Sequence, residues 1–279
     1  NWLLSDHFIF LGYRDYQLDK ENGDIALRVV DGSGLGVLRD SKPGKISKHF
    51  SEMPPEARTE ALSKHMLIIS KSSFESRVHR AVKNDLIGIK VFDEQGNVIG
   101  EHRILGLYTS TAYNSRPYSI PVLREKVKEV MTKSKLSATG HAGKALLNIL
   151  ENLPRDDLFQ ASTDELLDLS MGILHLQERR VIRLFVRKDI YNRFVSCLVY
   201  VPKDRYSTDL RYEIQDILKK AFHADEIHYN TLIGESVLAR IHFMIKINQK
   251  NPINYDVKAI EQDIIDVARL WREDLKEAL

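Results

Sequence analysis

The residues best suited to bind a small anion lie in two segments of the first half of the chain. Arg77 and His79 alternate along an extended segment, so their side chains share one face. Arg103 follows in a later β-rich segment. Guanidinium groups match the geometry of carboxylates and phosphates. Arg77, His79 and Arg103 are therefore candidates for an anion pocket. The alternative is a solvated strand face with ordinary salt bridges, which is the more common arrangement.

Two glycine-containing motifs are suggestive of phosphate binding but have the wrong spacing. Residues 32–36 (GSGLG) follow a predicted strand, yet they do not match G-x-G-x-x-G, and Pro43 precedes any helix. Residues 140–145 (GHAGKA) resemble a P-loop, but Ala145 replaces the Ser or Thr that binds magnesium. We expect a glycine turn at the first motif and the start of a helix at the second.

Other reactive residue types have no suitable partner nearby in the sequence. Cys197 lies in mid-strand without a neighbouring histidine, so we expect a buried thiol that packs as a small hydrophobe. Asp156 and Asp157 follow a helix-ending proline and are expected in a loop with caps, not as paired catalytic acids. His175 and His242 are expected to be structural. The sequence predicts no catalytic residue, no cofactor-binding residue and no metal site.

Composition narrows the class of protein. The 279 residues carry 41 basic and 39 acidic side chains, a net charge of +2, which gives no electrostatic case for nucleic acid. One cysteine excludes an internal disulfide, which favours a reducing compartment, and we expect a cytoplasmic protein. No apolar run reaches the length of about 18 residues needed to cross a membrane. Because the chain begins with Asn1, not Met, we expect a fragment of a longer polypeptide; a trimmed terminus is the alternative.

These candidate residues must be positioned by two sheets and a group of helices. Strands are predicted at 8–18 and 25–30, around the hairpin signal Asn22-Gly23, and at 66–71, 86–92 and 98–108. This five-stranded antiparallel sheet, with a short helix at 56–64, resembles sensor folds of the PAS type. Apolar spacing and capping residues predict helices between 115 and 177.

The last third of the chain has the clearest pattern. Strands are predicted at 181–187, 194–201, 227–233 and 237–247, with helices at 209–222 and 257–275. In the last strand, odd positions from Val237 to Ile247 are apolar, whereas Arg240, His242 and Lys246 lie on the other face, where a partner would bind. This ββαββα order fits an ACT-like variant of the ferredoxin-like sandwich. The fold class is α+β, with a PAS-like or ACT-like domain at 1–114, a helical linker at 115–177 and an ACT-like domain at 178–279.

Particular strings resemble one family. They are residues 76–80 (SRVHR), 99–110 (IGEHRILGLYTS), 143–147 (GKALL), 154–160 (PRDDLFQ), 172–179 (GILHLQER), 193–202 (RFVSCLVYVP) and 235–243 (ESVLARIHF). Together they look like the N-terminal regulatory region of the large bacterial NAD-specific glutamate dehydrogenases, and the resemblance covers nearly the whole chain. It implies a long parent enzyme that oxidatively deaminates L-glutamate to 2-oxoglutarate and ammonia with NAD. It also implies that the catalytic domain and its NAD site lie further along, so no catalytic residue is carried over.

Two functions remain open at this point. In the first, the chain is a regulatory module that binds an amino-acid effector and shifts the conformational equilibrium of the parent enzyme. In the second, it is a structural module for oligomerisation or docking, without a small-molecule ligand. The expected partners are the catalytic domain of the parent and further copies of the chain.

Overall fold

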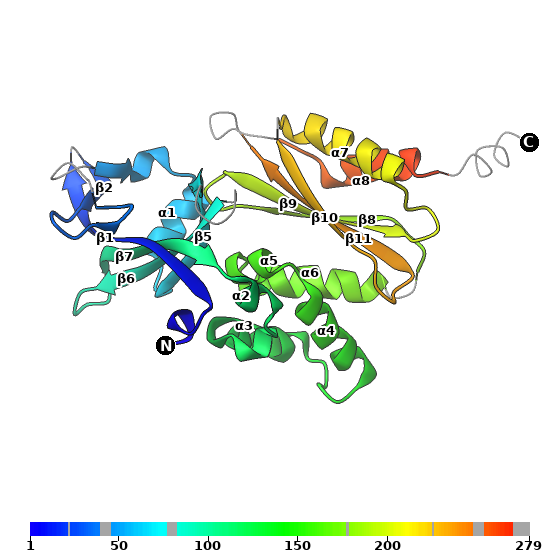
Figure 1. Cartoon of the computed structure of the whole chain (residues 1–279), viewed down its shortest axis with the longest axis horizontal. Helices are drawn as coiled ribbons and strands as arrows, with labels where there is room; N and C mark the ends of the chain where they lie inside the picture. Colours follow the sequence, from blue (N-terminus) through cyan, green and yellow to red (C-terminus); the bar gives the residue numbers. More distant parts are fainter. Residues whose placement is uncertain are drawn as a thin grey trace, which may run out of the picture. The chain divides into compact units, whose positions relative to one another are not determined.

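The computed structural model of the chain describes residues 1–21, 23–39, 46–76, 83–176, 179–224, 226–247 and 254–269 (Figure 1). The chain forms two compact units. The first unit contains Asn1–Thr132 and Arg155–Thr163, and the second contains Lys133–Pro154 and Asp164–Leu279. The predicted α+β class, with antiparallel sheets and helices in the middle of the chain, is confirmed. The predicted boundaries at 114/115 and 177/178 stay predictions.

The first unit is built on a curled antiparallel sheet of PAS type. Its strand order is β4-β2-β1-β7-β6-β5, and β3 pairs with β1. The five predicted strands are confirmed, and the short strands β3 and β4 are additional. The strands are β1 (Phe8–Glu21), β2 (Asp24–Val29), β3 (Leu35–Gly36), β4 (Ile46–His49), β5 (Leu67–Glu75), β6 (Lys83–Phe92) and β7 (Val98–Tyr108). The helices are η1 (Trp2–Leu4), η2 (Phe50–Glu52), α1 (Pro55–Leu62), α2 (Ser110–Asn114), η3 (Pro117–Ser119), α5 (Arg155–Gln160) and most of α3 (Pro121–Ser134).

Glycine-based turns set the register of this sheet. Glu21 pairs with Asp24 across the predicted hairpin, where Gly23 has a φ of +85°. The motif at 32–36 is a glycine turn, as predicted, and its last residues form β3 against β1. Gly36 has a φ of +60°, and an added Cβ would lie 2.1 Å from the carbonyl oxygen of Leu11. Only glycine fits this position without moving the backbone of β1.

Gly36→Ala is expected to lower the free energy of unfolding by more than Gly96→Ala does. Gly96 also has a positive φ, +80°, but no atom lies within 4 Å of an added Cβ. Its replacement therefore costs only the left-handed backbone strain, about 1–2 kcal/mol. Gly36→Ala adds the backbone overlap with Leu11. Urea unfolding of both variants measures the difference, and equal losses would contradict the importance of this close approach.

The second unit contains a four-stranded antiparallel sheet in the order β10-β11-β9-β8. The predicted ACT-like order of strands and helices is confirmed: β8 (Arg183–Lys188), β9 (Phe194–Pro202), α7 (Thr208–Phe222), β10 (Ile227–Leu232), β11 (Leu238–Lys246) and α8 (Val257–Val267). The helices α4 (His141–Asn152) and α6 (Thr163–Leu176) precede them. The helix start predicted near residue 140 is the start of α4, for which Gly140 is the N-cap.

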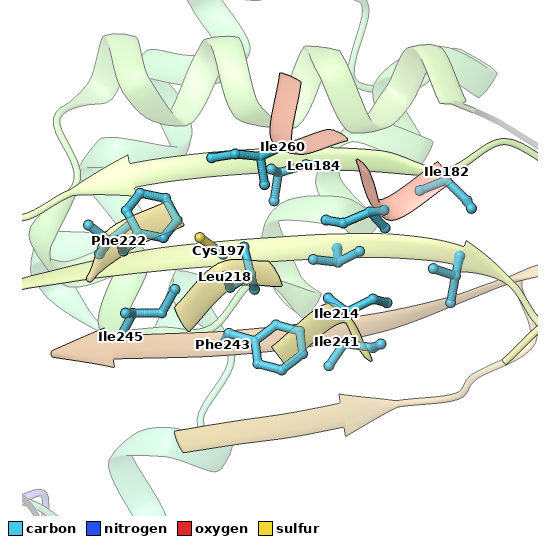
Figure 2. Close-up of a cluster of buried hydrophobic side chains, with 14 of the residues drawn as sticks. Ile182, Leu184, Cys197, Ile214, Leu218, Phe222, Ile241, Phe243, Ile245 and Ile260 are labelled. Atoms are coloured by element: carbon cyan, nitrogen blue, oxygen red, sulfur yellow. The ribbon is translucent and has the colours of Figure 1, made fainter. Parts of the chain in front are cut away.

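The core of the second unit lies between the sheet and the pair α7 and α8 (Figure 2). The predicted alternation in β11 is confirmed, because Ile241, Phe243 and Ile245 are fully buried. Ser207 caps α7 by accepting a hydrogen bond of 3.0 Å from the Leu210 N–H. Cys197 is buried in the middle of this core, as predicted. Burying one large aliphatic side chain contributes about 1.5–3 kcal/mol, so this cluster is a sufficient core for the unit.

The closing helix is shorter than predicted. The sequence pattern predicts a helix over 257–275, but α8 ends at Val267. The N–H of Ala268 donates to the carbonyls of Ile264 and Asp266, a tightened last turn that ends the helix. Residues 270–275 of the prediction lie outside the described residues.

Candidate functional site

Arg103 is the one predicted anion-binding residue that the structure describes; Arg77 and His79 lie outside the described residues. Arg103 Nε and Nη2 donate to the two carboxylate oxygens of Glu101, both at 2.9 Å. Its guanidinium carbon lies 4.3 Å from the centre of the Tyr16 ring. Glu101 is only 7% exposed. The guanidinium group of Arg103 therefore already binds a carboxylate of its own chain, and the anion pocket stays a prediction.

A second cation lies on the same face of the sheet. Lys90 pairs across the strands with Glu101. Its Nζ donates to the carbonyl oxygen of Ser63 at 3.0 Å, to Ser63 Oγ at 2.9 Å and to the carbonyl oxygen of Glu60. These carbonyls are at the end of α1, where a cation is favourable. Burial lowers the pKa of Lys90, against the opposing effect of Glu60 and Glu101. This network fixes α1 on the sheet.

A second buried charge cluster is on the other face of the sheet, and sequence reasoning did not find it. Lys71 Nζ lies 2.6 Å from Asp85 Oδ1 and 2.9 Å from Asp156 Oδ1, and donates to Tyr113 Oη at 3.0 Å. Tyr113 donates in turn to Asp156 at 2.8 Å. The N–H of Tyr108 donates to the other oxygen of Asp85 at 2.8 Å. We call these five residues the Lys71 cluster.

The Lys71 cluster holds α2 and α5 against the sheet, since Tyr113 is in α2 and Asp156 is in α5. The rings of Tyr108 and Phe159 stack beside it, with centroids 4.4 Å apart. The expectation of a loop at Asp156-Asp157 is wrong, because both residues are in the first turn of α5. Acidic residues are favourable there, and Asp156 also meets a buried lysine. The sequence signal was weak: Lys71 ends the predicted strand at 66–71, and Asp85 directly precedes the predicted strand at 86–92.

Burial disfavours the charge of Lys71, but attraction to Asp156 and Asp85 outweighs it and raises the pKa of Lys71 well above its usual value of 10.5. For a tyrosine the charged form is the phenolate, so burial has the opposite effect and raises the pKa values of Tyr108 and Tyr113. Lys71 is therefore a permanent cation at neutral pH, neutralised by carboxylates. Such a lysine is unsuited to nucleophilic or general-base chemistry, which requires the neutral amine. The cluster is an electrostatic anchor for the two helices.

In the second unit, the polar face of β11 contacts a helix of the same unit. Arg240 donates to the carbonyl oxygen of Asn152 at the end of α4. His242 Nε2 lies 2.9 Å from Ser196 Oγ, in agreement with the expected structural role. In α6, a Cβ on Gly172 would lie 2.6 Å from the Phe185 ring, so this glycine allows α6 to approach β8 closely. That a partner binds this face stays a prediction.

Two exposed tyrosines of the second unit stack on a buried arginine, an arrangement that sequence reasoning also missed. The guanidinium carbon of Arg211 lies 3.7 Å from the centre of the Tyr212 ring and 4.1 Å from that of Tyr229. Arg211 is only 3% exposed, whereas Tyr212 and Tyr229 are 54% and 50% exposed. Because Tyr229 is on β10 and Arg211 is on α7, the stack joins the helix to the edge of the sheet.

Within the described ranges, no group of three or more His, Cys, Asp or Glu side chains could hold a metal ion. In the same part of the chain, no helix is long and apolar enough to cross a membrane. Every ionised cluster above is satisfied inside its own unit. The geometry therefore defines an α+β protein with a PAS-like sheet and an ACT-like domain, whose polar residues hold elements together.

Comparisons with known proteins specify this class further. A family model described as "Glutamate dehydrogenase, ACT2 domain" matches residues 183–272, and "Glutamate dehydrogenase, helical motif 1" matches residues 120–179. The chain is 42% identical over 277 residues to the NAD-specific glutamate dehydrogenase of Halomonas elongata, and 40% identical over 273 residues to that of Pseudomonas aeruginosa. It is 28% identical over 276 residues to that of Mycobacterium tuberculosis. The chain belongs to the family of the large NAD-specific glutamate dehydrogenases.

Coverage is uneven in these alignments. The Halomonas and Pseudomonas alignments cover 99% and 98% of this chain but 17% of each relative, and the Mycobacterium alignment covers 96% of this chain and 15% of the relative. Among solved structures, a blue-light activated histidine kinase of Erythrobacter litoralis EL346 is 10% identical over 87% of this chain and 96% of that chain. Its TM-score of 0.25 is too low to support any argument about fold.

Proposed function

We propose that this chain is a non-catalytic regulatory and assembly region of a large NAD-dependent glutamate dehydrogenase. The parent enzyme would deaminate L-glutamate oxidatively to 2-oxoglutarate and ammonia, with NAD bound in a catalytic domain outside this chain. The observation that carries the proposal is the uneven coverage: nearly all of this chain aligns with a small part of enzymes that bear this name. The match to an ACT2 domain supports a regulatory position for that part.

The internal chemistry of the chain supports a non-catalytic role. Lys71 and Arg103 are neutralised by carboxylates of the same unit, and the one thiol is fully buried. A reaction centre requires groups that are free to meet a substrate. The partners we propose are the catalytic domain of the parent, further copies of the chain and an amino-acid effector, without nucleic acid or membrane. The cytoplasm suits a chain with a single free thiol.

The effector and the catalytic role are tested separately. Calorimetry of the 279-residue chain against a panel of amino acids and nucleotides is expected to show binding of one amino acid. In the parent enzyme this binding would shift activity by a coupling of about 1–3 kcal/mol. Silence of the whole panel at millimolar concentrations would favour the second candidate, an oligomerisation or docking module without a ligand. Glutamate-dependent formation of NADH by the isolated chain would contradict a non-catalytic role.

A further inference from the structure

Three side chains that could bind a metal ion converge on the sheet of the first unit, and the proposed function uses none of them. Asp15 on β1 is directly opposite His102 on β7. Tyr13 is two residues before Asp15, so the three side chains share one face of the sheet. His102 Nδ1 lies 2.5 Å from Asp15 Oδ1 and 2.9 Å from Tyr13 Oη, and Tyr13 Oη also donates to Asp15 Oδ1. An imidazole nitrogen, a carboxylate oxygen and a phenol oxygen therefore meet at one point.

The protons of these groups are too few to give each of the three contacts its own hydrogen bond. The hydroxyl of Tyr13 has one proton, and Nδ1 of His102 carries at most one. The carboxylate of Asp15 is an acceptor only, and it takes both of these protons. The contact between Tyr13 Oη and His102 Nδ1 is then left without a proton of its own. A cation bound by all three atoms would satisfy the three of them at once.

The three donor atoms suit a divalent transition-metal ion of the zinc type. Imidazole nitrogen and carboxylate oxygen are ordinary ligands of such ions, and the phenol oxygen adds a third donor. Ligand distances of about 2.0–2.2 Å place the ligand atoms of a tetrahedral ion roughly 3.3 Å apart, so the three atoms need to separate by less than about 1 Å. The side chains of His102 and Asp15 are 45% and 29% exposed, which leaves room for this movement and for water as a further ligand.

We propose that Tyr13, Asp15 and His102 form a binding site for one divalent transition-metal ion, with water completing its coordination. The site goes beyond the proposed function and does not depend on it. Its third ligand is a tyrosine, so it is not one of the groups of three His, Cys, Asp or Glu side chains that the described ranges lack. The backbone that carries Asp15 is already fixed, because its N–H donates to Ser33 Oγ at 3.1 Å, and Ser33 Oγ donates to the carbonyl oxygen of Val30 at 2.6 Å.

Calorimetric titration of the full 279-residue chain with Zn²⁺, after treatment with a chelator, tests this proposal. The wild-type chain is expected to bind one ion at this site. Asp15→Asn keeps the shape of the side chain but removes its charge, His102→Ala removes the ring nitrogen, and Tyr13→Phe removes the phenol oxygen. Each is expected to weaken binding by at least about tenfold, since even the loss of a residue that only orients a ligand typically costs about 10–100-fold.

His228→Ala is the matched control for His102→Ala. His228 also lies beside a carboxylate, with its Nε2 3.0 Å from Glu226 Oε1, and its side chain is 73% exposed. At this second pair, however, Lys246 Nζ lies 3.0 Å from Glu226 Oε2. A cation is therefore already bound to the carboxylate, and His228→Ala should bind Zn²⁺ as the wild-type chain does.

The possible outcomes separate clearly. The three substituted side chains are partly exposed, so the variants should stay folded, and urea unfolding checks this. A wild-type chain that binds no Zn²⁺ at millimolar concentrations would overturn the proposal. So would binding that Asp15→Asn and His102→Ala leave unchanged, and unchanged binding by Tyr13→Phe would contradict a site of three ligands. No amino acid or nucleotide is present in this titration, so its failure leaves the regulatory proposal to its own test.

Discussion

Replacing Lys71 with methionine is expected to lower the free energy of unfolding of the first unit by about 3–5 kcal/mol, the usual cost of removing one partner from a buried ion pair. The side chains of Lys71 and Asp85 are only 11% and 3% exposed. The variant would leave the buried Asp85 carboxylate without a cation. Urea unfolding gives the loss of stability. Hydrogen exchange should show that α2 and α5 are released from the sheet before β6 and β7 open.

Lys133→Met is the matched control for Lys71→Met. Lys133 lies 2.7 Å from Asp164, but the two side chains are 39% and 79% exposed. Solvent screens such a pair, so its removal should change stability by less than about 1 kcal/mol. If Lys71→Met were as mild as this control, the Lys71 cluster could not be the anchor of α2 and α5.

The same cluster predicts a loss of stability at alkaline pH. The folded-state pKa of Lys71 is raised above the usual value of 10.5. The stabilising contribution of its charge is therefore fully present below pH 10.5 and is lost as the pH rises through the raised folded-state pKa. The raised pKa values of Tyr108 and Tyr113 act in the same direction. Thermal melts of the wild-type chain should decline in this window, and Lys71→Met should remove the part due to the lysine.

Phe243→Ala is expected to lower the free energy of unfolding of the second unit by about 3–5 kcal/mol, as for other buried aromatic residues cut back to alanine. Phe243 is 0% exposed and lies in the middle of the core on β11 (Figure 2). The loss combines the transfer of apolar surface to water with the cavity left under α7 and α8. Differential scanning calorimetry measures the transition of this unit.

Phe10→Ala is the comparison for Phe243→Ala. Phe10 is the same residue type but is 53% exposed on β1 of the first unit. Surface substitutions of this kind usually change stability by no more than about 0.5 kcal/mol. Similar effects of the two substitutions would show that the buried cluster of the second unit does not dominate its stability.

The parts of this fold that sequence reasoning predicted are those determined by local patterns. The alternation of apolar residues in β11 identified its buried face, because side chains in a strand alternate with a period of two. The capping role of Ser207 in α7 is also a local feature, because serine is a common N-cap residue and stands here directly before an amphipathic run. The hairpin at Gly23 was predicted from the dipeptide Asn22-Gly23 alone. In each case the signal is contained in fewer than about 20 neighbouring residues, the length of one element.

Two of the contacts that could not be predicted join partners far apart in the sequence. Lys71 meets Tyr113, 42 residues later, and the Leu184 N–H meets Glu261, 77 residues later. Glu261 lies beside the apolar face of its helix, four residues after Val257 and three before Ile264, and nothing near it in the sequence indicates its partner on β8. The candidate anion-binding residue Arg103 was correctly placed on a strand, but its carboxylate partner, Glu101, lies two residues away on the same strand. Residue type indicated an anion partner and could not distinguish an internal one from a ligand.

The single cysteine allows the opening of the second unit to be followed by chemical labelling. Cys197 is the only thiol in the chain and is 0% exposed at the centre of the core of this unit. A thiol reagent can reach it only when the strands and helices around it separate. The rate of chemical labelling is therefore expected to measure the opening of the ACT-like unit, whose core contains Cys197. The wild-type protein therefore needs no introduced label for an experiment that follows the opening of its ACT-like unit.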